Sequence, residues 1–118
     1  MAKAEINIKE IEQYLYVFGY AKFQQLWKEF CECSTQNWQN LKTLSLDEKK
    51  YIFHNWRAGS KIFGMDEFAN LCQKTEDCII NCRTDKVQSL INKCQHSYEC
   101  QIVLVEEFLL RKDAENDE

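Results

Sequence analysis

The sequence contains no proline, only three glycines in 118 residues, and no long uninterrupted apolar run. A protein built from β-strands needs a turn every few residues, and turns rely on glycine and proline. The near absence of both therefore argues against an all-β fold. Few stretches alternate apolar and polar residues, which also argues against alternating strands and helices. The remaining class is an all-α protein, and 118 residues are enough for one domain.

The chain also lacks a basic excess, because its formal net charge is −4 at pH 7. The terminal residues 112–118 (KDAENDE) hold one lysine and four acids, or −3, which leaves −1 for the body 1–111. A body so close to neutral does not favour binding to nucleic acid. We expect the acidic tail 112–118 to be disordered, because it has no apolar residue to anchor it beyond one alanine.

No segment has the pattern of a signal peptide or of a membrane span. The most apolar late stretch, residues 102–105 (IVLV), is followed directly by two glutamates. It is too short to cross a bilayer, which takes about 20 apolar residues. The N-terminus shows no charged segment followed by an apolar one. The sequence therefore predicts a cytoplasmic protein with no membrane partner.

Seven cysteines are many for this length, and an odd number cannot all pair. Without an export signal, reduced thiols are expected. No pair of them has the two-knuckle spacing of a structural zinc site, so no metal is predicted, and a Cys/His metal-binding bundle stays the alternative. Cys31, Cys33 and Cys100 have no clear place in the pattern. The others fall on apolar stripes, where a free cysteine acts as a small hydrophobe: Cys72, Cys78, Cys82 and Cys94.

Apolar residues recur at spacings of three and four through five segments, which predicts five helices. These are expected over residues 8–18, 20–43, 47–63, 66–82 and 84–111. Short connections join antiparallel neighbours, so the pattern predicts an up-down-up-down four-helix bundle with a short extra N-terminal helix, all within residues 1–111.

Residues at the expected helix ends support these boundaries. Asn7 with Glu10, and Ser45 with Glu48, have the spacing of a capping box. Gly19 and Gly64 can stop a helix, because glycine adopts the left-handed conformation readily. Polar residues that can cap the later helices stand at the next two expected starts: Asp66, and Thr84 or Asp85.

The helix over 47–63 carries a histidine opposite its apolar side. At 100° per residue, the apolar side lies about 140–200° from His54 and holds Ile52, Trp56, Gly59 and Phe63. Within about 60° of His54 lie Lys50, Arg57, Lys61 and the small Ala58. Three cations disfavour protonation of the ring, which keeps it nucleophilic, and they would stabilise an attached phosphoryl group. A plain surface histidine on a basic face is the alternative, and His96 is expected to be one.

Residues 54–68 (HNWRAGSKIFGMDEF) resemble the signature of histidine-containing phosphotransfer (HPt) domains, roughly H-x-L-K-G-S-x-x-x-(L/F)-G-A-x-x-L. The resemblance puts His54 at the phosphorylated histidine and Arg57 at the usual lysine. It puts Ala58 and Gly59 at the small positions, Phe63 and Gly64 at the helix end, Phe68 at the next core contact, and Glu76 at a later acidic position. The departures are Trp56 for leucine, Ala58 for glycine and Met65 for alanine.

This resemblance implies a phosphorelay carrier in two-component signal transduction. His54 would accept a phosphoryl group from a receiver-domain phospho-aspartate and pass it to another receiver. The implied partners are response-regulator receivers or a hybrid sensor histidine kinase, with Mg²⁺ on the receiver and no cofactor on this chain, which is expected to be monomeric. The chain has no phosphate loop or kinase motifs, so no ATP-dependent activity is expected. The alternative is an adaptor that docks a receiver without accepting phosphate.

Overall fold

The computed structural model describes residues 5–116, and within that range the chain is helical with no strand. Five α-helices pack together, which confirms the predicted all-α class. Their bounds are α1 (Ile8–Phe18), α2 (Tyr20–Asn40), α3 (Leu46–Ile62), α4 (Asp66–Ile80) and α5 (Thr84–Asn116), with a 3₁₀ turn η1 (Leu41–Thr43) after α2.

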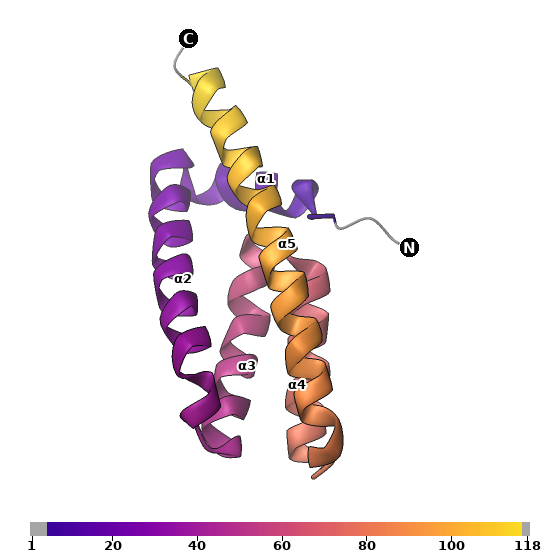
Figure 1. Cartoon of the computed structure of the whole chain (residues 1–118). Coiled ribbons are helices and arrows are strands. Elements are labelled where there is room, and N and C mark those ends of the chain that lie inside the picture. Colours follow the sequence, from indigo (N-terminus) through magenta and orange to yellow (C-terminus); the bar gives the residue numbers. More distant parts are fainter. Residues whose placement is uncertain (1–4, 117–118) are drawn as a thin grey trace.

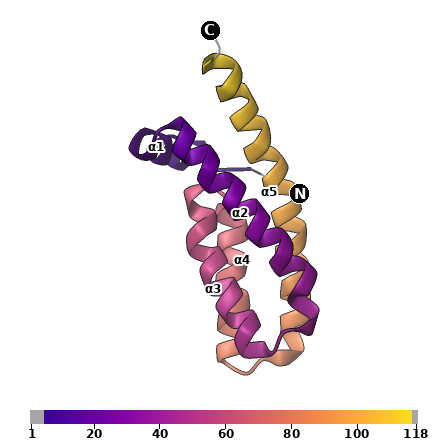
Figure 2. The ribbon, with the colours of Figure 1, turned by 90° about the vertical axis from the view of Figure 1, so that its left-hand side faces the viewer.

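Helices α2 to α5 run along the long axis of the molecule and alternate in direction, while α1 lies across one end (Figures 1 and 2). The backbones approach most closely between α3 and α4 and between α4 and α5. Aromatic side chains fill the space between α2 and α3. The Phe63 ring, for example, lies 5.0–5.2 Å from the ring centroids of Phe23, Trp27 and Phe30. These large side chains set α2 further out than α4.

The predicted start of α3 is confirmed in detail. The Ser45 side chain accepts a hydrogen bond from the Glu48 backbone N–H, and the Glu48 carboxylate accepts one from the Ser45 N–H. This complete capping box satisfies two of the N–H groups that a helix start leaves free. At α1 only half of the box forms, with the Asn7 side chain accepting from the Glu10 N–H.

The prediction that Asp66 caps α4 is wrong, because Asp66 is already the first helical residue. Its carboxylate accepts a hydrogen bond from the Asn7 side-chain amide at 2.9 Å. The free N–H of Phe68 is instead satisfied by the buried Gln101 side chain of α5, at 3.1 Å. The other end of the Gln101 amide donates to the Glu5 carbonyl, which ties the N-terminal segment to both helices.

The predicted disorder of the acidic tail is wrong for residues 112–116, which continue α5 as helix; residues 117–118 lie outside the described range. The extension has local support. The Tyr20 hydroxyl lies 3.2 Å from the Asp113 carboxylate and 3.3 Å from the Leu109 carbonyl oxygen. Lys112 pairs with Glu115 at 3.5 Å, a spacing that favours helix. These contacts hold the part of α5 that projects past the other helices (Figure 2).

The buried side of α3 differs from the predicted one. Trp56 and Phe63 are buried as expected, but Ile52 and Gly59 are only half-buried, and Phe53 and Ser60 are fully covered. At 100° per residue this rotates the buried side by roughly 50°. The physical reason is α4, which packs closely on that flank of α3 and covers residues that the apolar pattern of α3 alone leaves open.

All seven cysteines are free thiols. Cys72 and Cys94 are buried, and burial raises the pKa of the Cys72 thiol. Burial, together with Glu106 and Glu32, raises the pKa of Cys31 to about 12. The predicted stripe position of Cys82 is wrong. Because α4 ends at Ile80, Cys82 is exposed in the following turn with φ +58°.

Within residues 5–116, no helix combines the length and the apolar character that crossing a membrane requires.

Candidate functional site

His54 lies in the middle of α3 and points to solvent, with 52% of its side chain exposed. Its neighbours Phe53 and Trp56 are buried, so the helical period turns His54 outward. The predicted exposure of this histidine is therefore found in the structure.

The imidazole of His54 is held by a carboxylate from the adjacent helix. Its Nδ1 atom lies 3.1 Å from each carboxylate oxygen of Glu76 on α4. Only 13% of the Glu76 side chain is exposed. His54 and Glu76 each stand eleven residues from Met65, in the turn between α3 and α4. In an antiparallel helix pair, residues equally far from the turn lie at the same level, which brings these two together.

This contact distinguishes the two ring nitrogens. A carboxylate only accepts hydrogen bonds, so the nitrogen facing it carries the proton. Nδ1 is therefore the donor, and Nε2 is the atom that holds a lone pair in the neutral ring. Over the described part of the chain, Nε2 has no hydrogen-bond partner from the protein. The arrangement presents a fixed ring with a free nucleophilic nitrogen toward solvent.

The predicted cations share this side of α3, but a carboxylate and not a cation contacts the ring. Lys50 pairs with Asp47 at 3.7 Å and is 41% exposed. Arg57 is half-buried, and Lys61 is exposed one turn further along. The expectation that positive charge surrounds the imidazole is thus corrected, because the packing of α4 places Glu76 next to it. Ala58, one turn after His54, is exposed and keeps the adjoining surface low.

The glycines of the signature have different roles. Gly64 is buried with φ +67°, and a Cβ there would lie 2.5 Å from the Asn7 carbonyl oxygen. The Gly64 carbonyl also accepts a hydrogen bond from the Asn7 N–H at 2.8 Å. At Gly59 a Cβ would lie 3.6 Å from the Phe30 ring, an ordinary contact. The small size of Gly59 is therefore not needed for close helix packing, since a flexible side chain and not a backbone faces it.

Two exposed apolar side chains near His54 were not predicted from the sequence. Tyr51, one turn before His54, is 67% exposed, and Ile80, one turn after Glu76, is 55% exposed. Tyr51 was detectable as an aromatic residue on an otherwise polar helix face. Ile80 was not, because it falls beside the buried Ile79 at the end of an apolar run.

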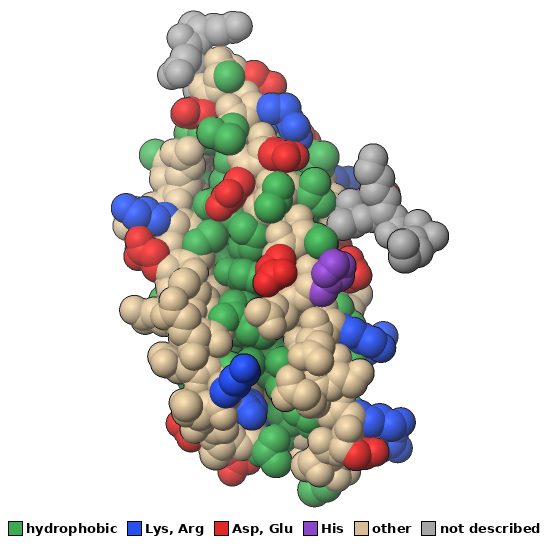
Figure 3. All heavy atoms as spheres, viewed as in Figure 1, with side chains coloured by type: hydrophobic (Ala, Val, Ile, Leu, Met, Phe, Trp, Pro, Cys, Tyr) green, Lys and Arg blue, Asp and Glu red, His purple; other side chains and the backbone are tan. Residues whose placement is uncertain are grey.

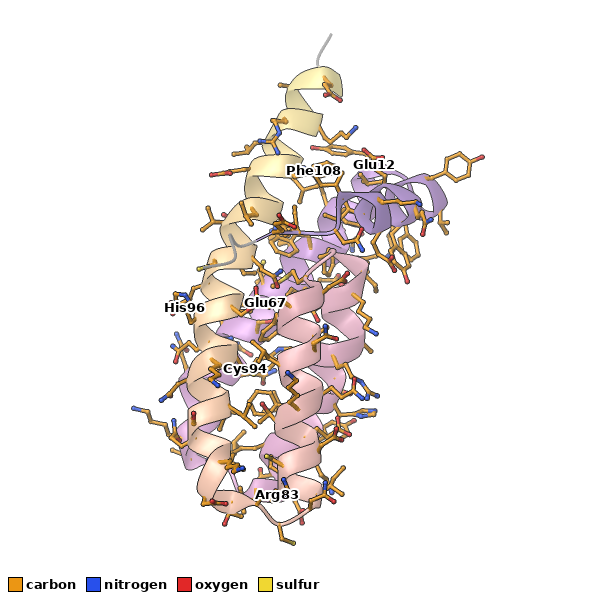
Figure 4. All side chains as sticks on the ribbon, turned by 90° about the vertical axis from the view of Figure 1, so that its right-hand side faces the viewer. Glu12, Glu67, Arg83, Cys94, His96 and Phe108 are labelled. Carbon is orange, nitrogen blue, oxygen red and sulfur yellow. The ribbon has the colours of Figure 1, made fainter. Side chains whose placement is uncertain are left out.

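The second histidine lies elsewhere. His96 is on the outer side of α5 and points away from the other helices (Figure 4). Its Nε2 lies 3.9 Å from the Cys100 sulfur, one turn along the same helix. Across residues 5–116, no three side chains of the His, Cys, Asp and Glu types are placed to hold a metal ion together.

Comparison with family models, with curated proteins and with solved structures found no match.

Proposed function

We propose that this protein is a histidine phosphotransfer carrier of a phosphorelay, with Nε2 of His54 as the phosphorylated atom. One observation carries the proposal: an exposed imidazole whose Nδ1 is hydrogen-bonded to Glu76 and whose Nε2 is free. The resemblance of residues 54–68 to the HPt signature supports the same assignment. The alternating directions of α2 to α5 fit the antiparallel four-helix bundle of such carriers, with α1 as the added helix.

The transfer step follows from this geometry. The Nε2 lone pair attacks the phosphorus of a receiver's aspartyl phosphate. A phosphorus–nitrogen bond forms, the acyl phosphate bond breaks, and the aspartate carboxylate leaves with the electron pair. The ring then carries positive charge, which the Glu76 carboxylate stabilises through the Nδ1 proton. Attack by a second receiver's aspartate on the phosphohistidine reverses these changes. The receiver would supply Mg²⁺, and this chain a positioned nucleophile.

Surface features near His54 suit a protein partner. Ala58 leaves the surface beside the ring low, and Tyr51 and Ile80 add exposed apolar area. Arg57 and Lys61 lie within two turns of His54, where they can reach a phosphoryl group or the acidic site of a receiver. These features support a carrier that works with receiver domains, and we propose that it acts as a monomer in the cytoplasm.

The test is phosphoryl transfer from a phosphorylated receiver domain of the same genome. We expect the wild-type protein to become labelled and His54→Gln to remain unlabelled while still folded, because exposed substitutions change stability by only about 0.5 kcal/mol. Incubation of the wild type with ATP and Mg²⁺ alone should give no label. Label on His54→Gln would exclude His54 as the site. A wild-type protein that binds receivers but takes no label from any of them would be an adaptor instead.

A further inference from the structure

A groove lies where the end of α2, the turn η1, the start of α3 and the first half of α5 meet. It encloses about 290 Å³. Its apolar lining comes from Trp38, Leu41 and Ile91. Small-molecule sites are typically concave and largely apolar, with a few polar groups that fix orientation. This volume is at the lower end of such sites, which suits a small ligand.

The charged lining of this groove is entirely basic. Lys42 and Lys49 reach it from η1 and α3 respectively, and no acidic side chain lines it. In the described part of the chain, neither lysine has a carboxylate oxygen within 4.0 Å. Two ammonium groups without a counter-charge thus share one concave site on a protein whose net charge is −4. Such a site is complementary to an anion.

The remaining lining consists of amide side chains on one face of α5. Gln88, Asn92 and Gln95 stand at helical spacings that align them. The Gln88 amide donates to the Asn92 side-chain oxygen at 2.9 Å, which leaves the Asn92 NH₂ group available as a donor. Amide groups of this kind hydrogen-bond the polar edge of a flat ring, and the apolar lining accommodates its face.

The groove is separate from the His54 site. Lys49 precedes His54 by five residues, which at 100° per residue places it about 140° around α3. Figure 3 shows basic side chains over hydrophobic ones between α2 and α5, in the lower half of that face. A ligand in the groove would therefore bind apart from the His54 site.

We propose that this groove binds a small organic phosphate that carries a planar ring, of the size of a nucleoside monophosphate. A phosphate monoester carries about −1.5 to −2 charge at pH 7, which matches two ammonium groups. Lysine is a common phosphate ligand as a point charge. The ring lies against Trp38 and Leu41, and the α5 amides read its edge.

The indole N–H of Trp38 is a suitable reporter, because it is buried and has no hydrogen-bond partner among residues 5–116. Its NMR resonance is followed while adenosine monophosphate, adenosine or inorganic phosphate is added. We expect a saturable shift with adenosine monophosphate, and at least tenfold higher concentrations for adenosine or phosphate alone. The Trp27 indole serves as the internal reference, since it lies outside this groove.

Two double variants with the same change of charge distinguish specific binding in the groove from non-specific electrostatic attraction of the anion to the protein. Lys42→Gln/Lys49→Gln should weaken binding of adenosine monophosphate at least tenfold, whereas Lys22→Gln/Lys28→Gln on α2 should leave it unchanged. His54→Gln should also bind normally, so failure of the phosphotransfer proposal would not affect this result. The absence of a saturable shift, equal binding of adenosine and its monophosphate, or equal weakening in both double variants would overturn the proposal.

Discussion

At the scale of single residues, the candidate site depends on the hydrogen bond between His54 and Glu76. The helical period of α3 predicts that His54 is exposed, because it depends only on residues of one helix. The partner of the ring could not be predicted from that helix, since Glu76 belongs to α4. The resemblance pointed to an acidic residue at this position but not to a contact. The register in which the antiparallel helices α3 and α4 pack places Glu76 at Nδ1 of His54, and this contact leaves Nε2 free.

Replacing Glu76 should therefore impair transfer without unfolding the protein. We expect Glu76→Ala to slow phosphoryl acceptance by roughly tenfold, at the low end of the 1.5–3 kcal/mol that a hydrogen bond to a charged group contributes. Glu76→Gln should lose less, because an amide oxygen still accepts from Nδ1. The measurement is the transfer rate from one phosphorylated receiver, with Asp77→Ala on the exposed side of α4 as the control.

Nitrogen chemical shifts of the His54 ring report the position of its proton. Glu76→Ala should increase the share of the form protonated at Nε2, which a purely structural change elsewhere would not do. If the tautomer and the rate both stay at their wild-type values, Glu76 does not position the ring.

The basic and small residues around His54 give a second prediction. Arg57→Ala and Lys61→Ala should each slow transfer a few-fold, because the donors near a phosphoryl group are lost while solvent screens part of the effect. Ala58→Glu should slow it more, since it puts bulk and negative charge where an acidic receiver site must dock. The same transfer assay on these three variants is the measurement. Equal rates in wild type and all three would show that this face is only solvated surface.

At the scale of helices, periodicity and caps made most of the boundaries predictable. The complete capping box at Ser45 and the stop at Gly64 depend on residues within one turn of the helix end. The start of α4 was not predictable in this way, because the Phe68 N–H in its first turn is satisfied by Gln101, 33 residues further along the chain. The end of α5 was missed for a similar reason, since its support comes partly from Tyr20 on α2. Local patterns identify helices, while contacts between helices decide where some of them begin and end.

The conformation of the turn between α3 and α4 can be tested by comparing the stabilities of two glycine-to-alanine variants. Gly64→Ala should destabilise the protein by at least ~2 kcal/mol, because alanine is strained at φ +67° and its Cβ would meet the Asn7 carbonyl. Gly59→Ala, five residues earlier in α3, should be neutral or stabilise by up to about 1 kcal/mol, since alanine favours helix and the Phe30 ring is at normal distance. Denaturant unfolding followed by circular dichroism measures both. Similar stabilities for the two variants would contradict the conformation of this turn.

At the scale of the whole molecule, aromatic side chains attach α2 to the other helices. Trp56 of α3 lies 4.6 Å from the Trp38 ring and 5.6 Å from the Phe68 ring, between centroids. Tyr98 of α5 joins the same group, and burial raises its pKa to about 12. A second group gathers around Phe63. The sequence predicts core positions for Trp56, Phe63 and Phe68, but which rings meet depends on the register between helices. Because α2 stands further out than α4, its attachment depends on these side chains more than on close backbone packing.

Removal of the Phe63 ring should therefore loosen the whole molecule. Phe63 is 2% exposed and contacts three aromatic rings of α2, so Phe63→Ala should lower the free energy of unfolding by roughly 3–5 kcal/mol. Tyr51→Ala removes a comparable ring from the exposed face of α3 and should change the free energy of unfolding by about 0.5 kcal/mol or less. Urea unfolding followed by tryptophan fluorescence is suitable, because Trp27 adjoins Phe63 and reports the separation of α2. A loss below about 1 kcal/mol for Phe63→Ala would mean that α3 is turned differently about its axis. His54 would then lose the exposed position on which the proposed phosphoryl transfer depends.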